Sequence, residues 1–290
     1  MTHKISARQH FAREDDFCQI NIHNLGGGFQ RHSHDYVEIV IILGGHARHF
    51  INEKSYDVGS GDVYVLQGRQ EHGFEGATGD FRVCNVMFRP ELVSFPFGRL
   101  RTLPGYQALF VMEPARRSSS GFRSLLRLDS ARLKEALEKV QRLRMEMDMR
   151  TPGFDCTGQA YLLELIVFLS RIYSSDSDTS KFGLLRFSEA IAWMEQNYVK
   201  HSTVKDLSGR AAMSERHFLR MFRKTFGTTP LEHLIRLRIR HAERLLQAGR
   251  HNITETAYAS GFSDSNYFSR QFRRIAGMSP RQYRDMSGRK

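Results

Sequence analysis

The chain has 290 residues, enough for two domains of ordinary size, each with a core of its own. Aliphatic and aromatic residues make up 40% and charged residues 26%, which excludes a disordered or fibrous protein. The net charge of +12 arises in one part of the chain: residues 1–180 hold 22 basic and 22 acidic side chains, and residues 181–290 hold 21 and 9. A basic domain beside a neutral one favours a polyphosphate partner, although a positive surface can also serve solubility alone.

No segment of the sequence is typical of a membrane or secreted protein. The first 17 residues lack the apolar core of a signal peptide. The longest apolar stretch, residues 161–169, contains Glu164 and is far shorter than the roughly 18–20 residues that span a bilayer. Three cysteines, Cys18, Cys84 and Cys156, argue against a disulfide framework. We therefore predict a cytoplasmic protein with reduced thiols and no membrane contact.

Residues 1–128 are expected to form an all-β domain. Short runs rich in β-branched and aromatic residues alternate with glycine-containing turns. The predicted strands include residues 38–43, 47–51 and 62–66. The predicted turns are residues 44–45, 52–54, 59–61 and 73–79. Closely spaced strands of this kind favour a β-sandwich or a small barrel.

Three histidines and one carboxylate form the candidate site of this domain. His32 and His34 lie two positions apart, so on a strand their imidazoles share one face, and Glu38 keeps that face if the strand runs unbroken. A later strand could bring His72 to the same pocket. This set would suit a divalent ion such as Zn, Fe, Mn or Ni. It would equally suit the polar lining of a sugar pocket, or a purely structural role.

This segment resembles the cupin barrel, in which metal-binding members carry their ligands at the positions of these four residues. Cupins usually show Pro and a spaced Gly before the last His, whereas here residues 67–71 read Gln-Gly-Arg-Gln-Glu. Regulatory cupins often keep such histidines as polar lining without a metal. We therefore expect no bound cofactor. The expected effector contacts are His32, His34, Glu38 and His72, with Arg48 and Tyr64 as further candidates.

Residues 129–173 are expected to form a pair of helices. Apolar side chains recur at helical spacing along the first one, at Leu133, Leu137, Val140, Leu143 and Met147. After a break at Thr151-Pro152-Gly153, residues 161–172 are apolar on nearly every face. Such a helix packs against its own barrel, forms a dimer interface, or does both. Residues 174–182 are polar and Ser-rich, which is typical of a linker.

Residues 183–290 are expected to form an all-α domain that contains one motif twice. Identical residues recur fifty positions apart: Phe218, Arg220, Phe222, Arg223, Gly227 and Pro230 match Phe268, Arg270, Phe272, Arg273, Gly277 and Pro280. Two copies indicate a paired module, because solenoids need about three or more. Capping signals and proline at the first helical position place the helices at 184–199, 203–211, 214–226, 229–247, 252–260, 264–275 and 279–286. In each copy a short helix, a tight turn and a longer helix form a helix-turn-helix.

The exposed face of each longer helix is the candidate DNA-reading surface. Arg216 with Arg220, and Asn266 with Arg270, are i, i+4 pairs, so each helix can present two readers to one groove. Arg pairs with guanine and Asn with adenine through two hydrogen bonds each. Any single arginine could instead be solvated or contact phosphate, but for the face as a whole we predict DNA contact. The predicted DNA-binding residues are Arg216, Leu219, Arg220, Ser265, Asn266, Ser269 and Arg270.

Over residues 184–286 the sequence resembles the AraC-type family of bacterial transcription regulators. The paired motif, the stretch with Arg238, Ala242, Leu245 and Leu246, and the run Gly-Phe-Ser-Asp-Ser-Asn-Tyr-Phe from residue 261 carry this resemblance. Six of the seven residues named above, all except Leu219, match base-reading positions of the family. Leu219 replaces a polar residue often found there, and could contact a thymine methyl group.

Upstream, the sequence around His32–Val40 and the Leu-Pro-Gly-Tyr-Gln stretch from residue 103 are similar to the sensor domain of the rhamnose-operon activators. The resemblance implies a multidomain protein: an N-terminal cupin-like barrel with a helical dimerisation segment, and a C-terminal domain with two helix-turn-helix motifs. It further implies an activator rather than an enzyme, which binds double-stranded DNA, a sugar-like effector such as L-rhamnose, a second copy of itself and RNA polymerase. The alternative is a metal-dependent cupin enzyme fused to a DNA-binding tail.

Overall fold

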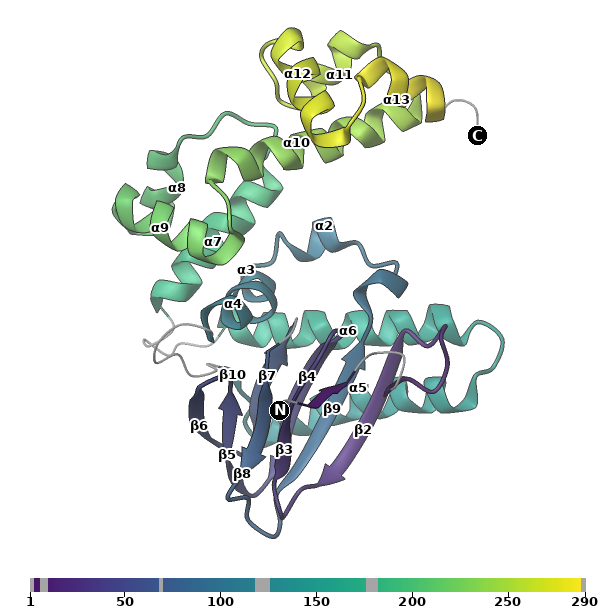
Figure 1. The fold of residues 1–290 in the computed structure, drawn as a ribbon, viewed down its shortest axis with the longest axis vertical. Coiled ribbons are helices and arrows are strands. Elements are labelled where there is room, and N and C mark those ends of the chain that lie inside the picture. Colours follow the sequence, from purple (N-terminus) through teal and green to yellow (C-terminus); the bar gives the residue numbers. More distant parts are fainter. Residues whose placement is uncertain (1–2, 6–9, 68–69, 118–125, 176–181, 288–290) are drawn as a thin grey trace. The chain divides into compact units, whose positions relative to one another are not determined.

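The chain, described here from a computed structural model, forms two compact units, Met1–Leu185 and Arg186–Lys290 (Figure 1). The structure describes residues 3–5, 10–67, 70–117, 126–175 and 182–287. Most of the predicted linker, at 176–181, lies outside these residues. The flanking positions are helical, because one helix continues to Ser175 and the next begins at Phe182. Each unit is described by itself below.

The first unit contains two five-stranded sheets. The first sheet has the order β1-β3-β8-β5-β6 and the second the order β10-β7-β4-β9-β2. The strands are β1 (His3–Ile5), β2 (Cys18–Asn24), β3 (Phe29–His34), β4 (Val37–Gly44), β5 (His46–Ile51), β6 (Lys54–Gly59), β7 (Asp62–Leu66), β8 (His72–Glu75), β9 (Arg82–Phe88) and β10 (Leu126–Arg127). Among the described strands, no hydrogen-bonded ladder joins the two sheets. The prediction of a β-rich N-terminal domain is confirmed, but closure into a barrel is not shown.

The expected strands at 38–43, 47–51 and 62–66 are confirmed as β4, β5 and β7. The expected turn at 73–79 is partly wrong, because β8 extends through Glu75. Gly73 lies within β8, and a Cβ atom there would stand 2.7 Å from the carbonyl oxygen of Phe29. This glycine therefore permits the close approach of β3 to β8 instead of forming a turn.

Apolar side chains from both sheets fill the space between them. Val40 and Ile42 of β4 pack there with Phe74 of β8 and Ile51 of β5. The alternate residues of β4, Ile39 and Ile41, are also fully buried. A strand that is buried on both faces reads as a continuous apolar run, which explains the unbroken sequence Ile-Val-Ile-Ile.

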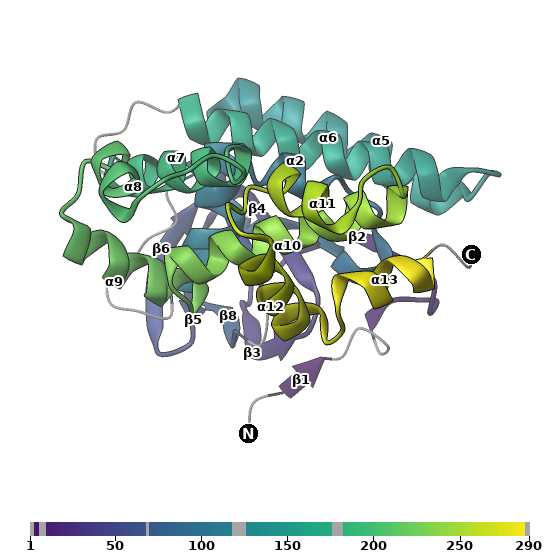
Figure 2. The ribbon, with the colours of Figure 1, turned by 90° about the horizontal axis from the view of Figure 1, so that it is seen from above.

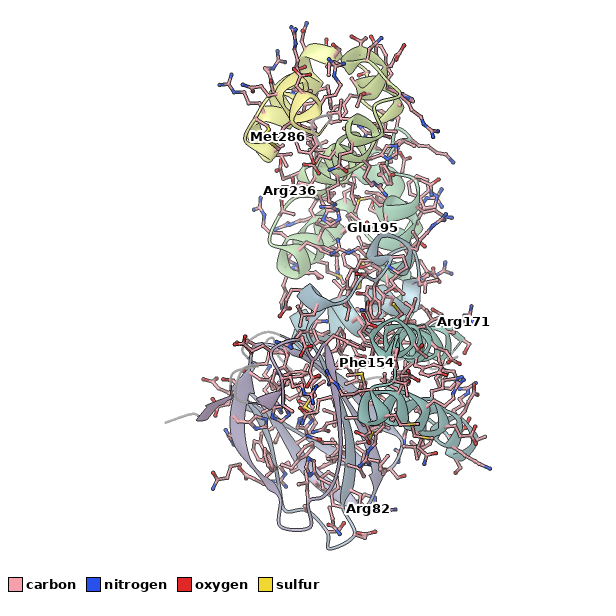
Figure 3. The ribbon with its side chains drawn as sticks, turned by 90° about the vertical axis from the view of Figure 1, so that its right-hand side faces the viewer. Arg82, Phe154, Arg171, Glu195, Arg236 and Met286 are labelled. Carbon is pink, nitrogen blue, oxygen red and sulfur yellow. The ribbon has the colours of Figure 1, made fainter. Side chains whose placement is uncertain are left out.

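Two long helices follow the sheets, as predicted for residues 129–173. They are α5 (Ser130–Met149) and α6 (Phe154–Ser175), which pack side by side next to the second sheet (Figure 3). The inward stripe of α5 includes Val140, Leu143 and Met147, in agreement with the predicted spacing. Shorter helical segments connect the sheets to this pair: η1 (Pro90–Leu92), α2 (Phe97–Leu100), α3 (Pro104–Tyr106), the π-helix η2 (Gln107–Met112) and α4 (Glu113–Arg117).

The second unit is helical, and each helix begins and ends within three residues of its predicted bounds. The helices are α7 (Phe182–Gln196), α8 (Val204–Arg210), α9 (Glu215–Phe226), α10 (Pro230–Ala248), α11 (Ile253–Ala259), α12 (Ser265–Ala276) and α13 (Pro280–Ser287). Thr203 and Asn252 begin α8 and α11 with complete capping boxes. Helix α10 runs between α8 and α9 on one side and α11 and α12 on the other (Figures 1 and 2). Within the described residues, no helix is long and apolar enough to cross a membrane.

Candidate nucleic-acid interface and effector cavity

Helices α9 and α12 have the same pattern of buried residues. Phe218 and Phe222 of α9 are fully buried, and so are the equivalent Phe268 and Phe272 of α12. The α12 pair packs on Ile239 and other residues of α10 in one apolar cluster. These phenylalanines hold each helix by one face, so the opposite face is directed to solvent.

The turn before each of these helices has the same hydrogen bonding. The amide of Met213 donates to the carbonyl of Ser208, and the amide of Phe262 to that of Ala257, both at 3.0 Å. This six-residue bond requires a left-handed residue at the turn. Gly261 takes that conformation in the second copy with φ of 89°, whereas Ala212 takes it in the first with φ of 52°.

The exposed faces carry the predicted DNA-binding residues. Arg216 and Arg220 project from α9, and Asn266 and Arg270 from α12; all four side chains are exposed. Arg216 and Arg220 form no hydrogen bond, ion pair or ring contact with any described residue. Free guanidinium groups on a helix held by its opposite face are available to a DNA groove.

The other three predicted DNA-binding residues share these faces. Leu219 is 39% exposed between the two arginines of α9. Ser265 and Ser269 are half-buried, and the Ser269 hydroxyl donates to the carbonyl of Ser265 at 2.9 Å. The structure thus brings the predicted set together in two groups, three residues on α9 and four on α12.

Not every arginine of the repeat is free. Arg274 of α12 donates to both carboxylate oxygens of Glu232 on α10, at 3.1 and 2.8 Å. Arg238 of α10 donates to the carbonyl of Tyr198 at 2.7 Å. These contacts join helices within the second unit, so we assign Arg274 and Arg238 to its architecture and not to base reading.

In the first unit, a cavity lies between the two sheets. It encloses about 510 Å³ of space not filled by protein atoms, part of which is open to solvent. His32 and His72 line it from the first sheet, and Glu38, Asn21 and Asn85 from the second. The remaining lining residues are His10, His23, Leu25, Phe29, Tyr36, Val40, Phe74 and Met87. The lining is mainly apolar and aromatic with a few convergent polar groups, which is typical of a small-molecule site.

Glu38 is the centre of a buried polar network. Its Oε2 atom lies 3.0 Å from Nε2 of His34 and 3.2 Å from Nε2 of His72. Glu38 is not on the strand of His32 and His34 as expected: the chain bends at Asp35-Tyr36, and Glu38 lies on β4 of the other sheet. Burial alone would raise the pKa of Glu38, but the hydrogen bonds from His34 and His72 outweigh it and lower the pKa.

Backbone carbonyls fix the orientation of all three histidines. The Nδ1 atom of His32 lies 3.1 Å from the carbonyl oxygen of Gln30, that of His34 lies 3.0 Å from Tyr36, and that of His72 lies 3.2 Å from Gln70. A carbonyl oxygen can only accept, so each Nδ1 carries a proton. His34 and His72 also direct Nε2 at Oε2 of Glu38.

His32 differs from its two neighbours. Burial and the nearby His72 lower the pKa of His32 from its ordinary 6.5 to about 4, so the ring is neutral at pH 7. With Nδ1 protonated, its Nε2 is an acceptor. Nitrogens of His32, His34 and His72 lie within 4.8 Å of one another. Since histidines that bind metals usually anchor their other nitrogen in this way, the set also fits a divalent cation.

Arg48 and Tyr64, the further effector candidates, do not line the cavity. Arg48 alternates with the inward-facing His49 on β5 and lies on the outer face, 3.9 Å from Asp57. Tyr64 is buried in the apolar core, edge-on to His49. Strand alternation directs Arg48 to solvent, and packing in the core surrounds Tyr64 with protein.

Several cavity residues were not identified from the sequence. Asn21 and Asn85 lie opposite each other on β2 and β9, and His10 reaches the cavity from the segment before β2. Strand alternation places Asn21 and His23 on the same face of β2, and this pattern could have indicated both residues from the sequence. His10 has no such signal, because its position depends on stacking against Tyr36 at 5.3 Å between ring centroids.

Comparisons with known proteins match a region in each of the two units. The AraC-like ligand binding domain family matches residues 16–146, and the helix-turn-helix domain family matches residues 207–286. The transcriptional activator RhaR of Shigella flexneri serotype 5b is 28% identical over 265 residues, which cover 90% of this chain and 89% of RhaR. The activator RhaS of Escherichia fergusonii is also 28% identical, over 89% of this chain and 88% of RhaS.

Among solved structures, the DNA-binding domain of AdpA in complex with a target DNA is 36% identical, covers 35% of this chain and 91% of that chain, and has a TM-score of 0.34. The two matched families together account for more than half of the chain and coincide with its two units. Proteins with these two matched domains are transcription regulators, so the alternative of a metal-dependent enzyme is wrong. The chain belongs to the AraC family of DNA-binding transcription regulators, with an N-terminal ligand-binding domain and a C-terminal helix-turn-helix domain.

Proposed function

We propose that the chain is a transcription activator whose effector is a small, uncharged, hydroxyl-rich molecule bound between the two sheets. This proposal rests on hydrogen-bond acceptors in the cavity wall that receive no hydrogen bond from the described part of the protein. Among the described residues, Oδ1 of Asn85 is buried without a hydrogen-bond partner, and the hydrogen bonds to Glu38 reach Oε2 alone. With Nε2 of His32, the cavity offers three free acceptors, and a sugar supplies hydroxyl donors to all three.

The resemblance of the first unit to the sensor domain of the rhamnose-operon activators supports L-rhamnose as the first candidate, and the similar RhaR and RhaS are transcriptional activators. A thermal-shift series over monosaccharides tests it. A ligand at one hundred times its Kd adds about 2.7 kcal/mol to the free energy of unfolding. The absence of a shift with every monosaccharide would reject the sugar assignment.

Two substitutions make this test specific. Because Asn85 Oδ1 has no hydrogen-bond partner among the described residues, Asn85→Leu is expected to remove the sugar-induced shift while leaving the unliganded Tm nearly unchanged. Arg48→Ala, on the outer face of the same unit, is the matched control and should keep the full shift. Equal shifts in both variants would place the ligand elsewhere.

We also propose a homodimer formed through α5 and α6. Met145 and Met149 of α5 are 61% and 67% exposed, which leaves apolar surface on a helix that already packs on α6. Light scattering tests this proposal: a monomer mass for Met145→Glu and a dimer mass for the unaltered chain are expected. An activator of this kind would also contact RNA polymerase. That contact can be tested on the complex of the protein with its operator.

A further inference from the structure

Gln67 and Gln70, which lie between β7 and β8 where the sequence departs from the cupin pattern, contact the π-helix and the turn after it. The side-chain amide of Gln67 donates to the carbonyl of Phe110 at 2.6 Å. That of Gln70 donates to the carbonyl of Pro114 at 2.9 Å. Both glutamines therefore bond to backbone carbonyl groups, one in the π-helix and one in the turn that follows it.

The same stretch is joined to the cavity through His72. The backbone carbonyl of Gln70 accepts from Nδ1 of His72, whose Nε2 donates to Glu38 at 3.2 Å. A ligand that donates to Oε1 of Glu38 binds the same carboxylate group whose Oε2 accepts from His72, so one side chain joins the two contacts. Any movement of the His72 ring therefore changes the geometry at Gln70 directly.

On its other side the π-helix is fixed to the last turn of α6. Glu113 follows the π-helix and is fully buried, and its Oε1 accepts from the hydroxyl of Tyr173 at 3.0 Å. Gly105, just before it, lies against α6 so closely that a Cβ atom would stand 1.8 Å from the carbonyl oxygen of Ser170. Segments on both sides of the π-helix therefore contact α6 within its final two turns.

We propose that Gln67, Gln70, Glu113 and Tyr173 form a relay that couples the cavity to the end of α6. The relay rests on the proposed function, because its input is an effector in the cavity. The π-helix of residues 107–112 is the element with two arrangements: its i→i−5 bonds convert to ordinary α-helical bonds when the register moves by one residue. Ser175 ends α6, the last described helix that lies wholly within the first unit, so a change at Tyr173 occurs near the end of that unit.

Hydrogen exchange of the full-length chain tests the relay without any effector. His72→Asn is the input, and amide exchange in residues 107–117 and 166–175 is the readout. In the otherwise unaltered chain, we expect His72→Asn to change exchange in both segments by about tenfold. In a chain that carries Gln67→Leu and Gln70→Leu, the same substitution should leave residues 166–175 unchanged, because the connection is missing.

Matched variants keep this experiment decisive. Gln159→Leu removes another glutamine side chain, which accepts from the amide of Ser94 near the start of α6, and should leave the coupling intact. Tyr173→Phe keeps the ring and removes only the hydroxyl, so it should reduce the coupling even if the leucine variants fold poorly. The relay is rejected if His72→Asn has no effect on residues 166–175, or has the same effect after either set of relay substitutions.

A second arm distinguishes the relay from the proposed effector. L-Rhamnose is added to the unaltered chain and to the double leucine variant, and its thermal shift and its effect on operator affinity are measured. Equal thermal shifts with loss of the operator effect in the variant alone support the relay. If L-rhamnose produces no shift in either chain, the effector assignment fails, and the exchange experiment still decides whether the relay exists.

Discussion

His34 and Glu38 are four residues apart in the chain but belong to different sheets, and a 3.0 Å hydrogen bond joins them. The bend between β3 and β4 makes this possible. Because His72 donates to the same carboxylate oxygen, one side chain of the second sheet holds two of the first. The network therefore acts both as part of the cavity wall and as a connection between the layers.

Replacement of Glu38 tests this connection. Glu38→Gln removes the charge that two histidines share, and we expect it to lower the free energy of unfolding by about 2–3 kcal/mol at pH 7. Since the pKa of Glu38 is lowered in the folded protein, its contribution is present above the unfolded pKa of about 4.3 and is lost as pH falls through the folded pKa. Urea denaturation at several pH values measures both effects. The control is Glu75→Gln, an exposed partner of Arg31, and an equal loss in the two variants would contradict the prediction.

His32 should make the first unit more stable as pH rises from about 4 to 6.5. In this range the unfolded chain binds a proton that the folded ring, with a pKa of about 4, does not. The gain reaches about 3 kcal/mol, and His32→Asn should remove that part of the pH dependence. Thermal unfolding across this range measures it, with the exposed His46→Asn as control. Identical pH profiles for His32→Asn and the unaltered chain would exclude His32 as the source.

The first helix-turn-helix has an alanine where the second has glycine. Because Ala212 is left-handed with φ of 52°, Ala212→Gly should raise the free energy of unfolding of the second unit by about 0.5–1 kcal/mol. The reciprocal Gly261→Ala should be destabilising, since a Cβ atom there would stand 2.7 Å from Cα of Val199. Chemical denaturation of the two variants measures the pair. A loss of stability in Ala212→Gly would show that the turn is not strained.

The two reading helices should recognise different bases. Arg220→Ala and Arg270→Ala are each expected to lose about 1–3 kcal/mol on the cognate operator and to relax base preference in separate parts of it. Fluorescence anisotropy with cognate, half-altered and random DNA measures these losses. Lys224→Ala, an exposed residue in the last turn of α9, is the control and should weaken all three DNAs alike. If the arginine variants behave like Lys224→Ala, the arginines contact phosphate only.

The helical unit could be predicted almost completely because its signals are local. Thr203 with Asp206, and Asn252 with Glu255, mark helix starts within four residues of sequence. The candidate DNA-reading side chains are then those on the helix face opposite Phe218 or Phe268. No information from distant parts of the chain is needed for that assignment.

The β unit could be predicted only in part, because its site is assembled from distant segments. His32, His34, Glu38 and His72 do come together, but the strand break before Glu38 has no glycine or proline to indicate it. The register that sets Asn21 opposite Asn85 depends on pairing across more than sixty residues. Gln67 and Gln70 gain their partners only once the segment around Pro114 is folded against them. Such contacts depend on tertiary packing and have no local sequence signal.

The two helix-turn-helix units have the same buried phenylalanines, but Arg216 and Leu219 of α9 stand where α12 has Asn266 and Ser269, so we expect folding and base preference to depend on separate positions. We expect a substitution at Asn266 or Arg216 to change the base preference without disturbing the buried phenylalanines that hold the helix. Each half of an operator can therefore diverge during evolution while the other half remains recognised. A duplicated module of this kind allows a regulator to acquire a new target stepwise, with one helix retaining the site at every stage.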